Sequence, residues 1–182
     1  MSTEEERGYL EAARRHNRTA LEARGVPAFA YRYARTHMAA DAAALYHDSM
    51  GEDGPMVAVA GRLAALRLQG KTMFAHVEDP SGRIQLYLRQ DALSEGWETA
   101  RLLDLDDHIG VTGTLFRTRT GEVTLRVLVV ELLAKSLRAL PRGKTAQTDA
   151  GTVTFGGLAD PEVRYRQRYA DLAVHPEVRK VF

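Results

Sequence analysis

The sequence predicts a mainly β protein with helices, built around a small barrel of five strands. Residues 71–78 and 83–89 each alternate in side-chain direction, so that one face of each strand is aliphatic and the other is largely polar or aromatic. Between them, Asp79-Pro80-Ser81-Gly82 has proline and glycine where a type I turn favours them. Together with a long β-type run over 56–69, these residues predict three consecutive antiparallel strands.

The order of the remaining elements indicates the type of barrel. Residues 91–103 carry apolar side chains at helical spacing: Leu93, Trp97, Ala100 and Leu103. Residues 109–118 and 123–133 are two further strands joined by Thr120-Gly121. A helix between the third and fourth strands of a five-stranded barrel is the arrangement of the OB-fold, which binds oligonucleotides or oligosaccharides. Gly61 in the first strand predicts the bulge or bend that closing a small barrel requires.

Segments on both sides of the barrel predict helices. Residues 3–24 are rich in Glu, Ala, Arg and Leu and are followed by Gly25, which is common at helix ends. A short helix is expected at 39–46. Residues 142–157 are rich in Gly, Thr and Ala and predict a flexible loop, after which Asp160-Pro161 starts a linker helix. The expected domains are a helical extension over 1–55, the OB-fold barrel over 56–141, and a loop with its linker helix over 142–182.

Composition restricts the chemistry. The chain has 182 residues, no cysteine and a net charge of +1, so any nucleic-acid contact must come from local charge patterns. The six histidines lack metal-ligand spacing, and neither a metal site nor a disulfide is expected. The acidic start MSTEEER is unlike a secretory signal, and no apolar run reaches membrane-spanning length. We therefore expect a soluble cytoplasmic protein without a membrane partner.

The outward face of the central hairpin suits single-stranded nucleic acid. Phe74 and Tyr87 supply aromatic planes for bases, Gln85 supplies an amide for base edges, and neighbouring arginines supply charge for phosphates. From these residues alone, an ordinary solvated polar face is an equally good interpretation. No phosphate loop, nucleophile elbow, zinc helix or pair of catalytic carboxylates is present, so no catalytic residue is expected in this stretch.

Five blocks of the sequence resemble the N-terminal part of a bacterial class II lysyl-tRNA synthetase. They are VAGRL at 59–63, GKTMFAHVEDPSGRIQLYLRQDAL at 70–93, IGVTGTLFRTRTGEVTL at 109–125, ELLAKSLRALP at 131–141 and EVRYRQRYADL at 162–172. The blocks stand in the family's order and the similarity covers nearly the whole chain. The last block is the most family-specific, because the related aspartyl and asparaginyl enzymes share the barrel but differ there.

This resemblance implies that the barrel binds the anticodon of a lysine tRNA. The anticodon-binding residues that it implies are Arg62 in the first strand, Phe74 for stacking, Gln85 for base reading and Glu131 late in the fifth strand. The basic side of the leading helix and the region of the last hairpin add candidates for contacts to the tRNA backbone: Arg14, Arg15, Arg18, Arg117, Arg119 and Arg126.

The resemblance also implies a parent enzyme, a class II lysine–tRNA ligase that is a homodimer. Its catalytic domain, which uses ATP and Mg²⁺, should begin near Phe182, so the present stretch is expected to hold no cofactor and not to aminoacylate alone. Residues 143–157 lengthen the family's usual link. The alternatives are a free-standing OB-fold module for tRNA or single-stranded nucleic acid, the anticodon domain of an aspartyl-type synthetase, and an oligosaccharide-binding barrel.

Overall fold

The computed structural model describes residues 3–51, 54–148, 151–155 and 157–181. The chain divides into two compact units, Met1–Arg138 and Ala139–Phe182. The first unit contains the barrel and the helices around it, and the second contains the segment that follows. The expected division into three domains stays a prediction.

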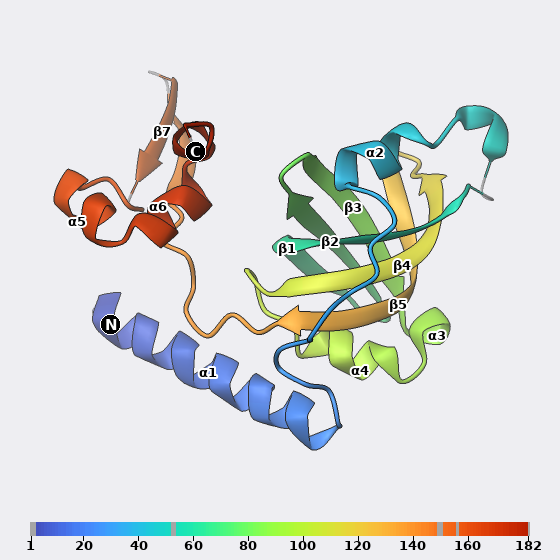
Figure 1. Cartoon of the computed structure of the whole chain (residues 1–182), viewed down its shortest axis with the longest axis horizontal. Helices are drawn as coiled ribbons and strands as arrows, with labels where there is room; N and C mark the ends of the chain where they lie inside the picture. Colours follow the sequence, from blue (N-terminus) through green and yellow to red (C-terminus); the bar gives the residue numbers. More distant parts are fainter. Residues whose placement is uncertain (1–2, 52–53, 149–150, 156, 182) are drawn as a thin grey trace. The chain divides into compact units, whose positions relative to one another are not determined.

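Five strands form a closed barrel in the first unit (Figure 1). They are β1 (Met56–Gln69), β2 (Thr72–Asp79), β3 (Gly82–Arg89), β4 (His108–Arg117) and β5 (Val123–Ala134). The order around the barrel is β1-β2-β3-β5-β4, and neighbours are antiparallel except for a short parallel seam between β3 and β5. The predicted five-stranded OB-fold is confirmed.

The alternating side chains of these strands fill the barrel interior. Leu63, Met73 and Leu86 are almost completely buried, and burial of an aliphatic side chain of this size contributes about 1.5–3 kcal/mol. A bulge or a bend was predicted at Gly61, and the structure places the register shift of β1 against β2 between Leu63 and Ala65. Gly61 serves a different purpose, because a Cβ there would lie 2.4 Å from the carbonyl oxygen of Glu78.

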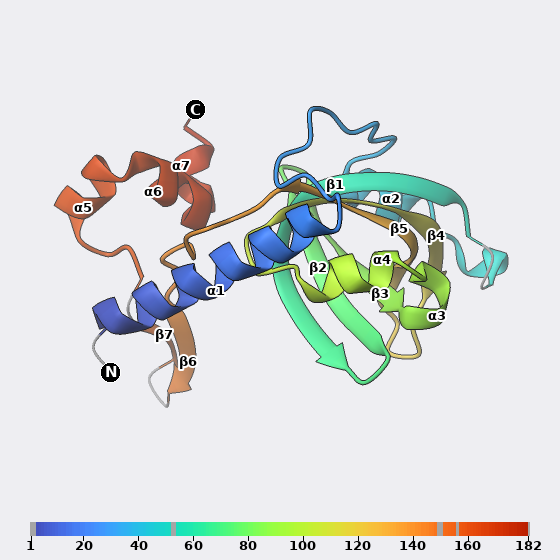
Figure 2. The ribbon, with the colours of Figure 1, turned by 90° about the horizontal axis from the view of Figure 1, so that it is seen from below.

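Two short helices connect β3 to β4, where a single helix over 91–103 was expected. They are α3 (Gln90–Leu93) and α4 (Gly96–Arg101), separated at Ser94, which has a positive φ of 49°. Leu93 and Trp97 are both buried in the barrel core, as the spacing predicted. The helices lie beside the strands in Figure 2. The break at Ser94 separates α3 from α4, and the side chains of Leu93 and Trp97 both stay buried.

The leading helix α1 (Thr3–Ala23) is attached to the barrel by buried contacts. Leu21 belongs to the barrel core, and the Arg14 guanidinium donates hydrogen bonds of 3.2 and 3.1 Å to the carbonyl and hydroxyl oxygens of Ser136. The helix ends as predicted at Gly25, where φ is +77° and the N–H of Val26 bonds to the carbonyl of Leu21. Helix α2 (Ala39–Ala44) and the turn η1 (Asp48–Met50) follow.

A buried ionic cluster lies where β5 ends. The Lys135 ammonium is completely buried and contacts the carboxylates of Asp104 and Asp107. The Asp107 carboxylate also accepts hydrogen bonds from the backbone N–H groups of Asp104 and Ser136. In addition, Asn17 of α1 donates to Asp104 at 3.1 Å. The cluster therefore joins α1, the loop before β4 and the end of β5.

The second unit contains an antiparallel hairpin and three short helices. Strands β6 (Lys144–Thr148) and β7 (Gly151–Phe155) pair where the sequence predicted a flexible loop, so that expectation is wrong. The predicted linker helix is divided into α5 (Pro161–Arg166), α6 (Arg168–Val174) and α7 (Pro176–Arg179).

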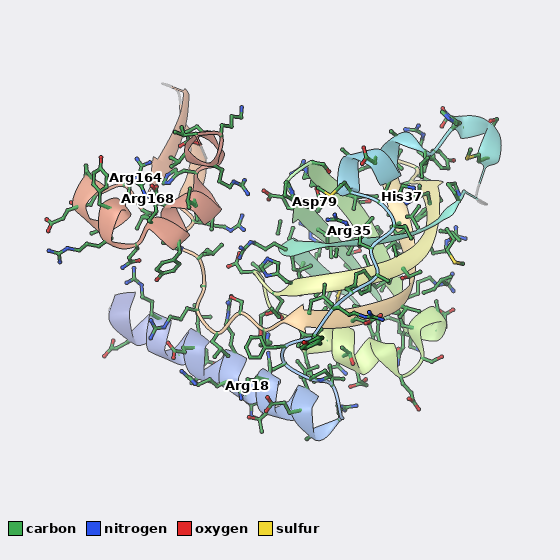
Figure 3. All side chains as sticks on the ribbon, viewed as in Figure 1. Arg18, Arg35, His37, Asp79, Arg164 and Arg168 are labelled. Carbon is green, nitrogen blue, oxygen red and sulfur yellow. The ribbon has the colours of Figure 1, made fainter. Side chains whose placement is uncertain are left out.

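Asp171 holds these three helices together. Its buried carboxylate accepts hydrogen bonds from Arg164 at 2.7 Å and Arg168 at 2.8 Å, both labelled in Figure 3, and contacts His175 Nδ1 at 2.8 Å. Burial alone would raise the pKa of Asp171, but these partners outweigh it and the pKa lies below its ordinary value. Across the described ranges, no helix is both long and apolar enough to cross a membrane.

Candidate nucleic-acid interface

The outward side chains of four neighbouring strands form one continuous surface. Phe74 lies opposite Tyr87, and His76 lies opposite Gln85, in the β2–β3 ladder. We call the surface the barrel face. It consists of Phe74, His76, Gln85, Tyr87, Phe116, Thr124 and Arg126, which come from β2, β3, β4 and β5. All of them are partly exposed except Thr124, which is completely buried.

An aromatic row crosses the barrel face. The ring centroids of Phe74 and Tyr87 are 4.9 Å apart with an interplanar angle of 33°, and those of Tyr87 and Phe116 are 6.0 Å apart. The Arg126 guanidinium lies 4.8 Å from the centroid of Phe116, within cation–π range. All four side chains are half-buried, so each is held in place and still partly accessible. The row offers planes for base stacking and, at one end, a positive charge.

A polar group lies next to this row. Gln85 Nε2 donates a hydrogen bond of 2.6 Å to Glu122 Oε2, and the Thr124 hydroxyl donates one of 2.8 Å to Gln85 Oε1. His76 Nε2 lies 3.1 Å from the other Glu122 oxygen. A glutamine amide has two donor hydrogens and two acceptor lone pairs, so these contacts leave one of each for a ligand. The sequence reasoning missed Glu122 and Thr124.

Arg62 lies at the margin of the barrel face. It pairs in register with Glu78 of β2 and with His108 of β4, one row beyond His76. Burial lowers the pKa of His108, and the positive charge of Arg62 lowers it further. Arg67, which was not predicted as a site residue, lies opposite Phe74 and shares its outward direction. Simple alternation along β1 would have placed Arg67 on the inward side with Leu63, and the register shift between Leu63 and Ala65 turns it outward.

Glu131 lies apart from the side-chain amide of Gln85. It is exposed near the end of β5, opposite Gly110. At about 3.3 Å per residue, the seven steps along β5 from Thr124 to Glu131 correspond to roughly 23 Å of extended chain. The ring of Tyr33 packs against Gly110, where a Cβ would lie 2.5 Å from it. Burial raises the pKa of Tyr33, and the negative charge of Glu131 adds to this effect. Glu131 is thus separated along β5 from Thr124, the hydrogen-bond partner of Gln85.

The predicted backbone-contact arginines have different surroundings. Arg14 is only 7% exposed and bonded to Ser136, so this surface role for it is withdrawn. Arg15 and Arg18 form exposed ion pairs within α1, and Arg117 pairs with Asp48 at 2.6 Å. Arg119 is exposed, and Arg126 is part of the barrel face.

The described residues contain no group of three histidine, aspartate or glutamate side chains arranged to hold a metal ion. The arrangement instead suits contacts of stacking, hydrogen bonding and charge. Residues 57–133 match the family model described as an OB-fold nucleic acid binding domain. The barrel is therefore a nucleic-acid-binding domain of the OB-fold class.

Known relatives define the class further. The chain is 39% identical over 180 residues to the lysine–tRNA ligase of Thermoanaerobacter sp. (strain X514), covering 98% of the chain and 33% of that relative. It is 46% identical over 138 residues to the lysine–tRNA ligase of Christiangramia forsetii, and the match covers 72% of this chain and 24% of that relative. It is 40% identical over 163 residues to the lysine–tRNA ligase of Carboxydothermus hydrogenoformans, and the match covers 89% of this chain and 30% of that relative.

The chain is an OB-fold anticodon-binding domain that matches the N-terminal third of lysine–tRNA ligases. It spans about a third of the length of the curated relatives it matches. The resemblance inferred from the five sequence blocks is thereby confirmed. The roles of individual residues remain predictions.

Proposed function

We propose that this chain binds the anticodon loop of a lysine tRNA on the barrel face and reads one of its bases with Gln85. The observation that carries the proposal is the adjacency of two register pairs. Phe74 and Tyr87 form an aromatic surface, and the next outward pair, His76 and Gln85, places an amide directly beside it. A base stacked on the ring would present its edge to the amide.

The properties of an anticodon fit this surface. Its bases are single-stranded and can be splayed out, stacked on aromatic rings and read on their Watson–Crick edges. Stacking on Phe74 would contribute about 1–3 kcal/mol. Arg62, Arg67 and Arg126 lie around the stacked base and would hold carbonyl groups or phosphates. Glu131, at the other end of β5, would accept a hydrogen bond from a different base.

We further propose that the full-length protein is a lysine–tRNA ligase, as its relatives are named. It would join lysine to tRNA with ATP and Mg²⁺ bound outside the present stretch, as a cytoplasmic homodimer. The present domain would supply the choice of tRNA. The similarity over 98% of the chain supports this assignment over a free-standing module or an aspartyl-type enzyme.

A binding titration tests the proposal. A fluorescent lysine-tRNA anticodon stem-loop is compared with one whose middle uridine is replaced by cytidine, at two salt concentrations. We expect the uridine stem-loop to bind more tightly, Phe74→Ala to weaken binding to both, and Gln85→Ala to remove the preference. Gln69→Ala, on an exposed glutamine at the end of β1, is the matched control and should change neither. Equal, strongly salt-dependent binding of both stem-loops would mean that only phosphates are recognised, which would refute the anticodon reading.

A further inference from the structure

We propose that Glu122 is a positioning residue that fixes the orientation of the Gln85 amide and thereby selects uridine over cytidine. The inference rests on the proposed function, in which Gln85 reads a base. Glu122 lies in the connection between β4 and β5, and its carboxylate accepts the 2.6 Å hydrogen bond from Gln85 Nε2.

The chemistry of the two partners determines which end of the amide faces which group. An ionised carboxylate can only accept hydrogen bonds, so it must face the NH₂ end of Gln85. The Thr124 hydroxyl, 2.8 Å from the carbonyl oxygen, can donate or accept. Thr124 would therefore tolerate either orientation. Glu122 is the partner that prevents the amide from turning over.

Glu122 is itself held by its loop and by β2. Its N–H donates a hydrogen bond of 3.1 Å to the Thr118 hydroxyl, and its carbonyl accepts one of 3.0 Å from the Thr118 N–H. Gly121 makes this tight connection possible with a φ of +91°. On the other side, His76 Nε2 lies 3.1 Å from the second carboxylate oxygen. Glu122 is therefore held from both sides while still 44% exposed.

A fixed amide distinguishes the two pyrimidines. On its Watson–Crick edge, uracil presents the O4 acceptor beside the N3–H donor, whereas cytosine presents an N4–H donor beside the N3 acceptor. Gln85 matches uracil when its NH₂ faces O4 and its carbonyl faces N3–H. It matches cytosine at the same two positions only if the amide turns over. A freely rotating amide would accept both bases, and one held by Glu122 accepts one.

The test compares Glu122→Gln with wild type in the full 182-residue chain. The new amide can donate as well as accept, so it no longer fixes Gln85. We expect the cytidine stem-loop to bind more tightly than it does to wild type and the preference for uridine to disappear, a fall of about 5- to 150-fold. Glu122→Ala, which removes the partner altogether, should give the same loss of preference.

The matched control is Asp48→Asn. Asp48 is an exposed carboxylate that pairs with Arg117, which also donates to the Gly121 carbonyl beside Glu122. This change removes a negative charge near the same loop without touching Gln85, so it should alter affinity for both stem-loops equally and leave the preference intact.

The outcomes separate this inference from the proposed function. If wild type prefers uridine and Glu122→Gln keeps that preference, the role of Glu122 is refuted and the proposed function stands. If wild type has no preference, both are refuted. If Asp48→Asn also removes the preference, local charge and not amide orientation is responsible, and the inference is again refuted.

Discussion

The carboxylate of Asp79, the last residue of β2, accepts a 2.7 Å hydrogen bond from the backbone N–H of Ala39, the first residue of α2. Its other oxygen accepts hydrogen bonds from the hydroxyl and N–H groups of Ser81 and from the N–H of Gly82. Met38, at the N-cap position of α2, provides no side-chain cap. Asp79, labelled in Figure 3, thus closes a hairpin and caps a helix that lies 40 residues earlier in the chain.

Replacing this carboxylate should reduce stability. In Asp79→Asn, one oxygen becomes an NH₂ group that cannot accept from a backbone N–H. We expect the free energy of unfolding at pH 7 to fall by about 1–2 kcal/mol, the usual contribution of a helix cap. Urea denaturation measures this. Asp41→Asn, on an exposed side chain of α2, should have a much smaller effect, and equal losses in the two variants would contradict the capping role.

The same residue predicts a pH dependence. Burial alone would raise the pKa of Asp79, but the hydrogen bonds from Ser81, Ala39 and Gly82 lower it below its ordinary value. A carboxyl group with a lower pKa in the folded state stabilises the protein above its unfolded pKa of about 3.9, and this contribution is lost as the pH falls through the folded pKa. The stability difference between wild type and Asp79→Asn should therefore be constant near neutral pH and shrink below about pH 4. Unfolding curves at several pH values test this, and a difference that stayed unchanged into acid would argue against it.

Tyr87 should contribute to binding even though the resemblance did not assign it a role. Its ring lies between those of Phe74 and Phe116, so Tyr87→Leu keeps much of the volume and removes the central plane of the aromatic row. We expect weaker binding of uridine and cytidine stem-loops alike, by about 1 kcal/mol or more. The control is Tyr31→Leu, on a tyrosine that is fully exposed outside the barrel face. A loss confined to the uridine stem-loop would show that Tyr87 acts through Gln85 instead.

Lys135 should be essential for stability. Lys135→Met leaves the carboxylates of Asp104 and Asp107 without the ammonium that neutralises them, and breaking a buried pair in this way typically costs about 3–5 kcal/mol. Adding Asp107→Asn should restore part of the loss, because it removes one of the two uncompensated charges. Thermal or urea unfolding gives the values, with Lys71→Met on an exposed lysine as the control. Comparable stability of Lys135→Met and Lys71→Met would rule out this role.

Local patterns were sufficient to predict most of the barrel. The alternation in 71–89 and the turn at Asp79 to Gly82 specified β2, β3 and the direction of their side chains. Leu93 and Trp97 were correctly predicted to be buried, but the break at Ser94 was not, because it depends on how both side chains fit one core. The β6–β7 hairpin was missed because the prediction gave weight to the Gly, Thr and Ala content of this segment and not to Thr152-Val153-Thr154-Phe155, a run of residues that favour strands.

The site was predictable only where its residues act within one hairpin. Phe74 and Gln85 could be placed on one face by counting along β2 and β3. Glu122 and Thr124 contact Gln85 across 37 and 39 positions of the sequence. No local sequence pattern around these residues predicts the two contacts. The burial of Arg14 is similarly a tertiary effect, since its partner Ser136 lies 122 positions away.

The parallel seam of the barrel involves only three register pairs, Gln85 with Thr124, Leu86 with Leu125, and Tyr87 with Arg126. Two of these pairs belong to the barrel face, so the surface exists only while the seam is closed. Gln85 and Thr124 are 39 positions apart in the chain, so pairing β3 with β5 carries a loop-closure penalty and typically slows folding. A stem-loop bound to the barrel face would therefore stabilise the closed seam. Binding would slow hydrogen exchange at the backbone amides of β3 and β5, because it lowers the population of locally opened barrel.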